Sequence, residues 1–218
     1  MSKTTDIREA VESELIFDPL VDATDITMKN LNGDVALNGT VPSYPQYLEA
    51  AAAAQRVVGV KQVHSHLAVE LPPGDYRDDA QLATAANNAL LWDVTVPAGI
   101  EATSRNGNIT LTGTVRYGSQ RTAAELAVGG LTGARNVKDE IDIDYDAADP
   151  VDVTALVQGA LDRNALVLDD SDVLVDTAGN TVTLTGHVRT WAEHDAVIDA
   201  TWMASGVYDV ADNLVITG

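Results

Sequence analysis

The stretches NGDVALNGTV (residues 32–41), NGNITLTGTV (106–115) and GNTVTLTGHV (179–188) decide the fold of this chain. They align almost without gaps, and their glycines Gly39, Gly113 and Gly186 lie 74 and 73 residues apart. A second glycine series keeps the same two spacings and consists of Gly59, Gly133 and Gly206. Because a register that recurs at a fixed spacing marks an internal repeat, we predict three copies of one folding unit.

Two short segments separate the repeats, LPPGD (71–75) and DAADP (146–150). Their proline and glycine residues interrupt both helical and strand periodicity, which is typical of linkers. We therefore place the three domains at residues 1–71, 75–145 and 150–218.

Each repeat shows the same order of helical and strand periods. Apolar residues at helical spacing come first, and two segments of alternating apolar and polar residues follow. The pairs Asn32–Gly33 and Asn106–Gly107 favour the positive φ angles of a two-residue hairpin turn. The third repeat has Gly179–Asn180 plus one extra residue, so we expect a longer turn there. An alanine-rich second helix, around 46–58, 119–131 and 191–204, and a final strand complete an α-β-β-α-β unit.

The two glycine series have different expected roles. Gly39 and its counterparts fall where the alternation calls for a core-facing side chain, so we expect a helix backbone to pass close by. Gly59 and its counterparts follow the second helices, where glycine commonly forms the C-terminal cap. We interpret all six glycines as structural.

These repeats resemble the BON domain, a module of bacterial osmotically induced, nodulation-related and transport-associated proteins. Its core has the form V-x-L-x-G-x-V, followed by a helix with spaced alanines and the pattern G-V-x-x-V-x-N-x-L-x-V. This chain carries the core as VALNGTV, ITLTGTV and VTLTGHV. It departs from the second pattern at Ala134, where Val is usual, and at three positions where Asn is common, Ser65, Asp139 and Asp212.

The resemblance implies an α+β fold of three tandem units, each with two helices packed on a small three-stranded mixed sheet. It also implies a non-catalytic role in envelope maintenance or osmotic stress through phospholipid or cation binding. The family has no common catalytic residues to carry over.

The composition of the chain narrows the function classes further. The 218 residues include 13 Lys and Arg against 33 Asp and Glu, a formal charge of −20, and no cysteine. Disulfide scaffolds, cysteine nucleophiles and thiolate metal sites are therefore excluded. Nucleic acid binding is disfavoured, because it depends on cationic side chains displacing counterions from phosphates. No apolar run approaches the roughly 20 residues of a membrane span, and the first residues lack the apolar stretch of a secretory signal. We expect a cytoplasmic protein that meets membranes only peripherally.

Candidate catalytic and metal-binding residues are few. The sequence contains no GxSxG elbow, HExxH helix, P-loop or GxGxxG turn. His64 and His66 would share one face of a strand and supply two metal ligands, but no third ligand is in view. The acidic run from Asp142 to Asp152 resembles the start of a calcium loop, yet Ala147 takes the place of the required glycine and Val153 that of the bidentate glutamate. We predict no catalytic residue, no cofactor and no dedicated metal site, and leave weak cation binding open.

The stretch from Arg105 to Lys138 is locally basic in this acidic chain. Glu125 is its single acidic residue, and its basic residues are Arg105, Arg116, Arg121, Arg135 and Lys138. Residues 1–74 and 75–148 each carry a charge of −5, and residues 149–218 carry −10. If any part of the chain contacts acidic headgroups, we expect this basic stretch to do so. The three tryptophans, Trp92, Trp191 and Trp202, we expect to pack between neighbouring repeats.

The leading hypothesis is thus a non-catalytic binding protein that acts through a phospholipid surface, a monovalent or divalent cation, or client proteins. The alternative is a protein-interaction or chaperone-like scaffold that never contacts lipid. An enzyme is the least favoured class, because no nucleophile, base and orienting group recur at matched positions.

Overall fold

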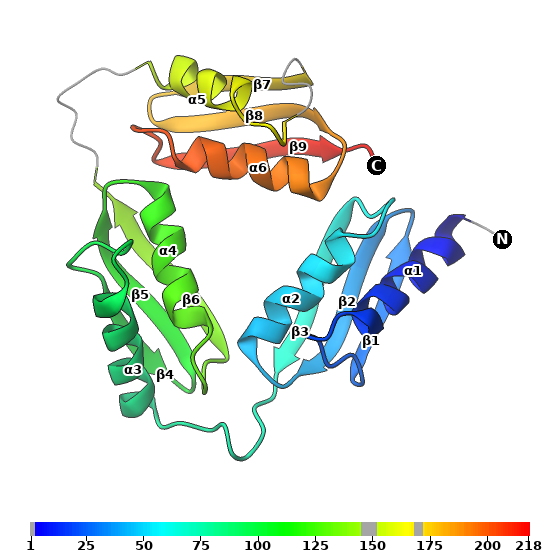
Figure 1. Ribbon diagram of the computed structural model, residues 1–218, viewed down its shortest axis with the longest axis vertical. Coiled ribbons are helices and arrows are strands. Elements are labelled where there is room, and N and C mark those ends of the chain that lie inside the picture. The colour runs from blue at the N-terminus through cyan, green and yellow to red at the C-terminus, as the bar shows by residue number, and fades with distance from the viewer. Residues whose placement is uncertain (1–2, 145–151, 168–171) are drawn as a thin grey trace. The chain divides into compact units, whose positions relative to one another are not determined.

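The computed structural model describes residues 3–144, 152–167 and 172–218. Within these ranges the chain forms three α-β-β-α-β repeats, and each repeat has its own three-stranded sheet (Figure 1). The predicted α+β fold of three tandem units is therefore confirmed. The expected linker at 146–150 lies outside the described residues.

The helices and strands occur in the same order three times. The first repeat consists of α1 (Lys3–Phe17), β1 (Ile26–Leu31), β2 (Asp34–Val41), α2 (Tyr44–Gln55) and β3 (Gln62–Val69). The second consists of α3 (Asp79–Trp92), β4 (Glu101–Arg105), β5 (Asn108–Val115), α4 (Gly118–Gly129) and β6 (Asn136–Ile143). The third consists of α5 (Val153–Asp162), β7 (Val173–Ala178), β8 (Thr181–Val188), α6 (Trp191–Trp202) and β9 (Asp209–Ile216).

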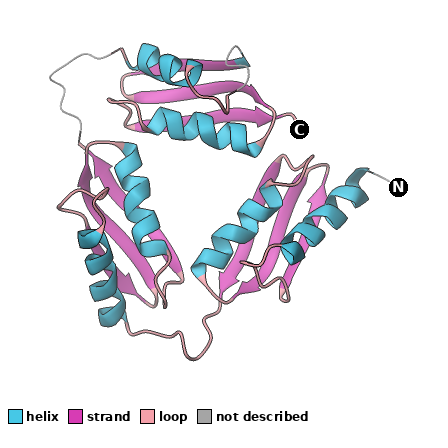
Figure 2. Cartoon of the chain, in the orientation of Figure 1, coloured by secondary structure: helices cyan, strands magenta, loops and turns pink. Residues whose placement is uncertain are grey.

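Each sheet is mixed and has the hairpin's second strand at its centre. In the first repeat β1 and β2 pair antiparallel, and β3 returns parallel to β2. The third repeat has the same pairing, and the strand order of the second repeat is β4-β5-β6. A parallel return requires a crossover, which the second helix of each repeat provides. The two helices of a repeat lie on one face of its sheet (Figure 2).

The hydrophobic core of each repeat lies between that sheet face and the two helices. Alternation along the central strand directs Val35, Leu37 and Val41 into the core of the first repeat. Val11 and Leu15 from α1 and a row of alanines from α2 complete this core. The matching strand residues of the other repeats are also buried, namely Ile109, Leu111, Val115, Val182, Leu184 and Val188.

The hairpin turns explain the Asn-Gly signature. Asn32 and Gly33 have φ angles of 56° and 102°, as a type I′ turn requires. The turn of the third repeat is no longer than the others, because Ala178 pairs with Thr181 and leaves two residues between the strands. The prediction of a longer turn is wrong. Glycine occupies the first central position there with a φ of 66°, which fits a type II′ turn.

Gly39, Gly113 and Gly186 do stand at a close backbone approach, but the approaching group is not a helix. A Cβ atom on Gly39 would lie 1.9 Å from the carbonyl oxygen of Asp25, just before the paired strand β1. The corresponding distances are 2.5 Å to the Gly99 oxygen and 1.8 Å to the Asp172 oxygen. All three glycines have φ between 125° and 135°. The strand pairing itself therefore requires glycine here.

Gly59, Gly133 and Gly206 are not helix caps, which corrects the second expectation. The second helices end earlier than predicted, and the C-caps of α2 and α6 are Arg56 and Met203 in right-handed conformation. Gly59 occupies the third position of a turn in which the Val60 N–H donates to the Val57 carbonyl at 3.2 Å. Its φ of 90° fits the position of a type II turn that favours glycine.

Candidate functional site

The predicted basic residues lie on several elements of the second repeat. Arg105 ends β4, and the Arg135 N–H donates to the Gly107 carbonyl at 2.8 Å, so both residues flank the hairpin turn. Arg116 follows the opposite end of β5, which at about 3.3 Å per residue is about 23 Å away along the strand. Arg121 lies on α4.

Lys138 lies on β6, where its ammonium group forms an ion pair with Glu140 at 2.5 Å. The turn-flanking arginines and Arg116 are farther apart than the Debye length of about 8 Å at physiological salt, so they act as separate charges. A contact of these five residues with lipid stays a prediction.

The two candidate metal ligands of the first repeat, His64 and His66, are exposed on one face of β3. Across the described ranges, no group of three or more His, Asp or Glu side chains is arranged to hold a metal ion. Asp146 and Asp149 of the acidic run, and Ala147 between them, lie outside the described residues.

A feature that sequence reasoning missed is the apolar end of the first helix in two repeats. The segments LIFD (15–18) and LLWD (90–93) each place one leucine in the core and the next two side chains in solvent. Phe17 is 80% exposed and Trp92 is 84% exposed. We call the exposed residues the apolar helix ends, which are Ile16, Phe17 and Leu20 in the first repeat and Leu91, Trp92 and Val94 in the second.

The third repeat lacks this feature, because Asp162 and Arg163 follow its buried Leu161. The sequence does contain a signal for this feature. At the end of the first helix, two aliphatic residues are followed by an aromatic one in both the first and the second repeat. The helical pattern alone did not show which of these residues point outward.

The packing of the three tryptophans between neighbouring repeats stays a prediction. Trp191 and Trp202 are half-buried against the core of their own repeat. Trp92 is instead exposed.

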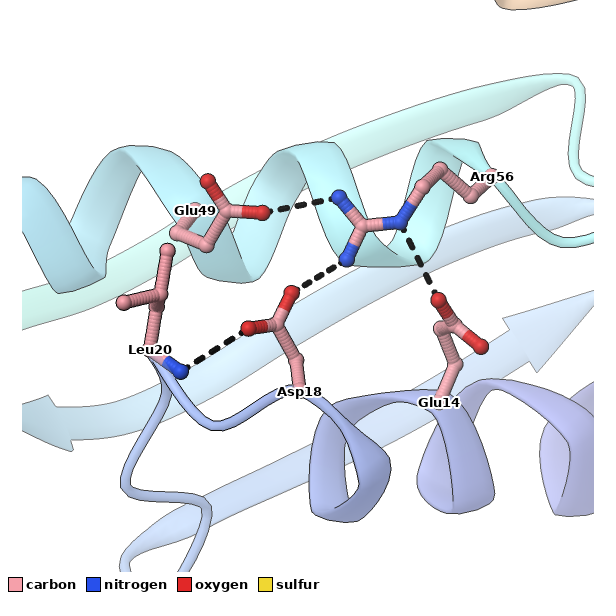
Figure 3. A network of polar contacts seen from close by, with 5 residues as sticks. All are labelled: Glu14, Asp18, Leu20, Glu49 and Arg56. Carbon is pink, nitrogen blue, oxygen red and sulfur yellow. Dashed lines mark hydrogen bonds and ion pairs between the residues drawn. The ribbon is translucent and has the colours of Figure 1, made fainter.

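The first repeat contains a polar network that joins its two helices (Figure 3). The Arg56 guanidinium donates to Glu14 at 3.0 Å, to Glu49 at 2.7 Å, and to Asp18. Asp18 is only 8% exposed and also accepts the Leu20 N–H at 2.9 Å. The bond from Leu20, and after it the one from Arg56, lowers the pKa of Asp18. The hydrogen bond to Glu49 raises the pKa of Arg56. This network holds α1 and the chain after it against α2.

Two further polar contacts stabilise the other repeats. In the second repeat, Asp79 accepts the N–H groups of Asn106 at 2.8 Å and Gly107 at 3.0 Å and the Ser104 hydroxyl at 2.8 Å. The backbone bond from Gly107 is the main reason why the pKa of Asp79 is lowered. This carboxylate therefore fixes the hairpin turn to the start of α3.

In the third repeat, the two ring nitrogens of His194 lie 3.1 Å from Asp195 and 2.8 Å from Asp212. The carboxylate of Asp195, and then that of Asp212, raises the pKa of His194, although burial acts in the opposite direction. The pair with Asp212 connects α6 to β9. Each of these polar groups has a structural role that needs no substrate.

None of the helices in the described part of the chain has both the length and the apolar character that crossing a membrane requires. The cytoplasmic location expected from the sequence stays a prediction.

Comparison with known proteins agrees with the repeat structure. The family model of the BON domain matches this chain three times, at residues 3–70, 78–145 and 149–218. The chain belongs to the BON domain family. Each match spans one α-β-β-α-β repeat, so we refer to the units as BON repeats from here on.

Among curated proteins, the chain is similar to "Osmotically-inducible protein Y" of Escherichia coli (strain K12), with 29% identity over 140 residues. The alignment covers 62% of this chain and 70% of that protein. Among solved structures, it is similar to a C-terminal domain of CdsD, described as a structural protein of the type III secretion system of Chlamydia trachomatis. That match has 18% identity, covers 98% of both chains and has a TM-score of 0.26.

Proposed function

We propose that this chain is a non-catalytic binding protein of osmotic-stress or envelope physiology that attaches peripherally to phospholipid surfaces. Membership of the BON family and the similarity to an osmotically inducible protein support the physiological setting. The observation that carries the lipid proposal is the pair of apolar helix ends, in which Phe17 and Trp92 are almost fully exposed.

Exposed aromatic and aliphatic side chains at a helix end fit the interfacial region of a bilayer, where one side of a ring is apolar and the other is hydrated. Burying such a side chain contributes about 1.5 kcal/mol or more, which corresponds to about tenfold in a partition constant. Two such ends on one chain act together, as weak membrane anchors generally do.

The charge of −20 opposes this attachment when the surface is anionic. Attachment by the apolar helix ends therefore strengthens when salt or a divalent cation screens the repulsion. Attachment by the basic residues Arg116, Arg121 and Arg135 would weaken under the same conditions. Salt dependence thus separates the two modes.

The test is vesicle flotation with phosphatidylethanolamine and phosphatidylglycerol at 3:1, at low and at physiological salt. Phe17→Ser and Trp92→Ser should each lower the bound fraction strongly. The matched control is Val58→Ser, because Val58 is equally exposed but lies in the turn after α2. A bound fraction that is unchanged in both variants but falls when the three arginines are replaced would favour attachment by the basic residues. No binding at any salt would favour the protein-interaction scaffold.

A further inference from the structure

The third BON repeat has an open groove between its two helices. The groove has a volume of about 670 Å³, and its lining includes Leu156, Ala160, Ala196, Ala200 and Met203 from or beside α5 and α6. Met203 is 68% exposed although its side chain is apolar. Small side chains form the floor and larger apolar ones form the rim.

The groove occupies the place of the Arg56 network of the first repeat. Arg56 and Met203 are the C-caps of the equivalent helices α2 and α6. Glu49 and Ala196 stand seven residues before them in the respective helices. A guanidinium and a carboxylate in the first repeat are thus replaced by a thioether and a methyl group in the third.

The other half of the network is replaced in the same way. Asp18 and Asn164 are equivalent, because each accepts the N–H of the leucine two residues later, at 2.9 Å and 3.0 Å. Glu14 and Ala160 stand four residues before them. All four counterparts of the network line the groove. The ion pairs that join the helices in the first repeat are absent from these positions, where three of the four side chains are apolar and Asn164 donates to the Ala196 carbonyl at 3.3 Å.

The surroundings of the groove are acidic. Asp199 lines it, Asp195 lies one helical turn earlier on α6, and Asp162 ends α5. Arg163 is the one basic residue among the described residues that line it. The stretch 149–218 contains only one other basic residue and carries a charge of −10. An anionic amphiphile would therefore be repelled, whereas a cationic one would be attracted.

We propose that this groove binds a basic amphipathic helix of a partner protein. The positions of Ala196, Ala200 and Met203 follow one face of α6 over two turns, which matches two turns of leucine side chains on an incoming helix. Alanine on the floor permits the close helix approach, since the distance between packed helices depends on the side chains at the contact. Lysine or arginine on the flanks of the partner then faces the acidic rim. This interaction is separate from lipid attachment, which uses the first two repeats.

The probe is a fluorescein-labelled peptide of 18 residues in which leucines at helical spacing form one face and lysines the other. Anisotropy titration with the whole chain should show saturable binding that weakens with salt. A peptide of the same composition in scrambled order should bind at least tenfold more weakly. A peptide with glutamate in place of lysine should not bind.

The decisive variant transfers the first repeat's network to the third. It combines Ala160→Glu, Asn164→Asp, Ala196→Glu and Met203→Arg, which fills the groove with the ion pairs seen in the first repeat. It also makes the chain more acidic, so unspecific attraction of the peptide should increase. We expect binding to fall at least tenfold, with a thermal unfolding midpoint close to that of the unmodified chain.

A gentler pair of variants keeps the test valid if the fourfold variant does not fold. Asp199→Lys on the groove should weaken the lysine peptide several-fold. Asp176→Lys, on the exposed face of β7, makes the same charge change elsewhere and should leave affinity within twofold. Equal effects of the two variants, equal binding of the scrambled peptide, or unchanged binding by the folded fourfold variant would overturn the proposal. So would saturable binding of laurate in the absence of any peptide binding, which would assign the groove to an acyl chain.

Discussion

Replacing Gly186 by alanine tests why one glycine recurs in register in all three repeats. The new Cβ atom would lie 1.8 Å from the Asp172 carbonyl oxygen, whereas such contacts are essentially never shorter than 3.0 Å. The start of β7 must therefore move by about 1.2 Å, the difference between these two distances. The φ of 128° is also one that alanine adopts only with strain.

The magnitude follows from these two effects. Backbone strain at a positive φ contributes about 1–2 kcal/mol. Moving the start of β7 weakens the hydrogen bonds of the neighbouring Leu174–Thr185 pair, and two of them are worth about 1 kcal/mol each. The free energy of unfolding should fall by about 3–4 kcal/mol. Small domains have little more than this in total, so much of the third repeat should be unfolded in water.

The assay is urea unfolding followed by the fluorescence of Trp191 and Trp202, which are half-buried in the third repeat. Gly179→Ala is the matched control, because Gly179 also has a positive φ but a Cβ there has no neighbour within 4 Å. It should lower the free energy of unfolding by only about 1 kcal/mol. Equal shifts of the urea midpoint in the two variants would refute the argument from close approach.

Three further predictions concern the polar contacts. The pKa of His194 is raised, so its contribution to stability is fully present below its unfolded pKa of about 6.5 and is lost as pH rises through the folded pKa. The third repeat of the unmodified chain should therefore lose stability over this pH range. His194→Gln should remove that loss. Asp79→Asn should speed amide hydrogen exchange at Gly107, and acid should do the same in the unmodified chain below the lowered pKa of Asp79. Arg56→Met should lower the urea midpoint of the first repeat, and adding Asp18→Asn should lower it little further, because the two residues act as one network.

Each of these predictions has a result that would contradict it. A pH profile of third-repeat unfolding that is the same in His194→Gln and the unmodified chain would show that the histidine is not coupled to folding. Unchanged exchange at Gly107 would mean that the turn holds without the carboxylate. Fully additive losses in the Arg56 and Asp18 variants would show that the ion pair contributes no coupling.

The repeat architecture could be predicted because it depends on local and periodic information. Helical and strand periods assigned the element order, and Asn32–Gly33 identified a turn that only a few residue types adopt readily. Gly39, Gly113 and Gly186 could be predicted as positions of close approach because each replaces a core-facing side chain in the strand alternation. Which group approaches them depends on the strand pairing, and the carbonyl of Asp25 is not visible in the sequence.

The candidate sites could not be predicted because they depend on tertiary contacts. Glu14 and Arg56 are 42 residues apart, and nothing local indicates that they meet. The exposure of Trp92 depends on where α3 ends relative to the sheet. The groove of the third repeat becomes visible only when the network positions of the first repeat are compared with their apolar counterparts.

The most direct test of membrane attachment uses the absence of cysteine in the chain. Val94→Cys, two residues after Trp92, and Val58→Cys can each be labelled with the environment-sensitive fluorophore NBD, since both positions are exposed. When vesicles are added, the account predicts a blue shift and protection from dithionite at position 94 and neither effect at position 58. Vesicle-bound protein whose label at position 94 stays fully accessible to dithionite would contradict it.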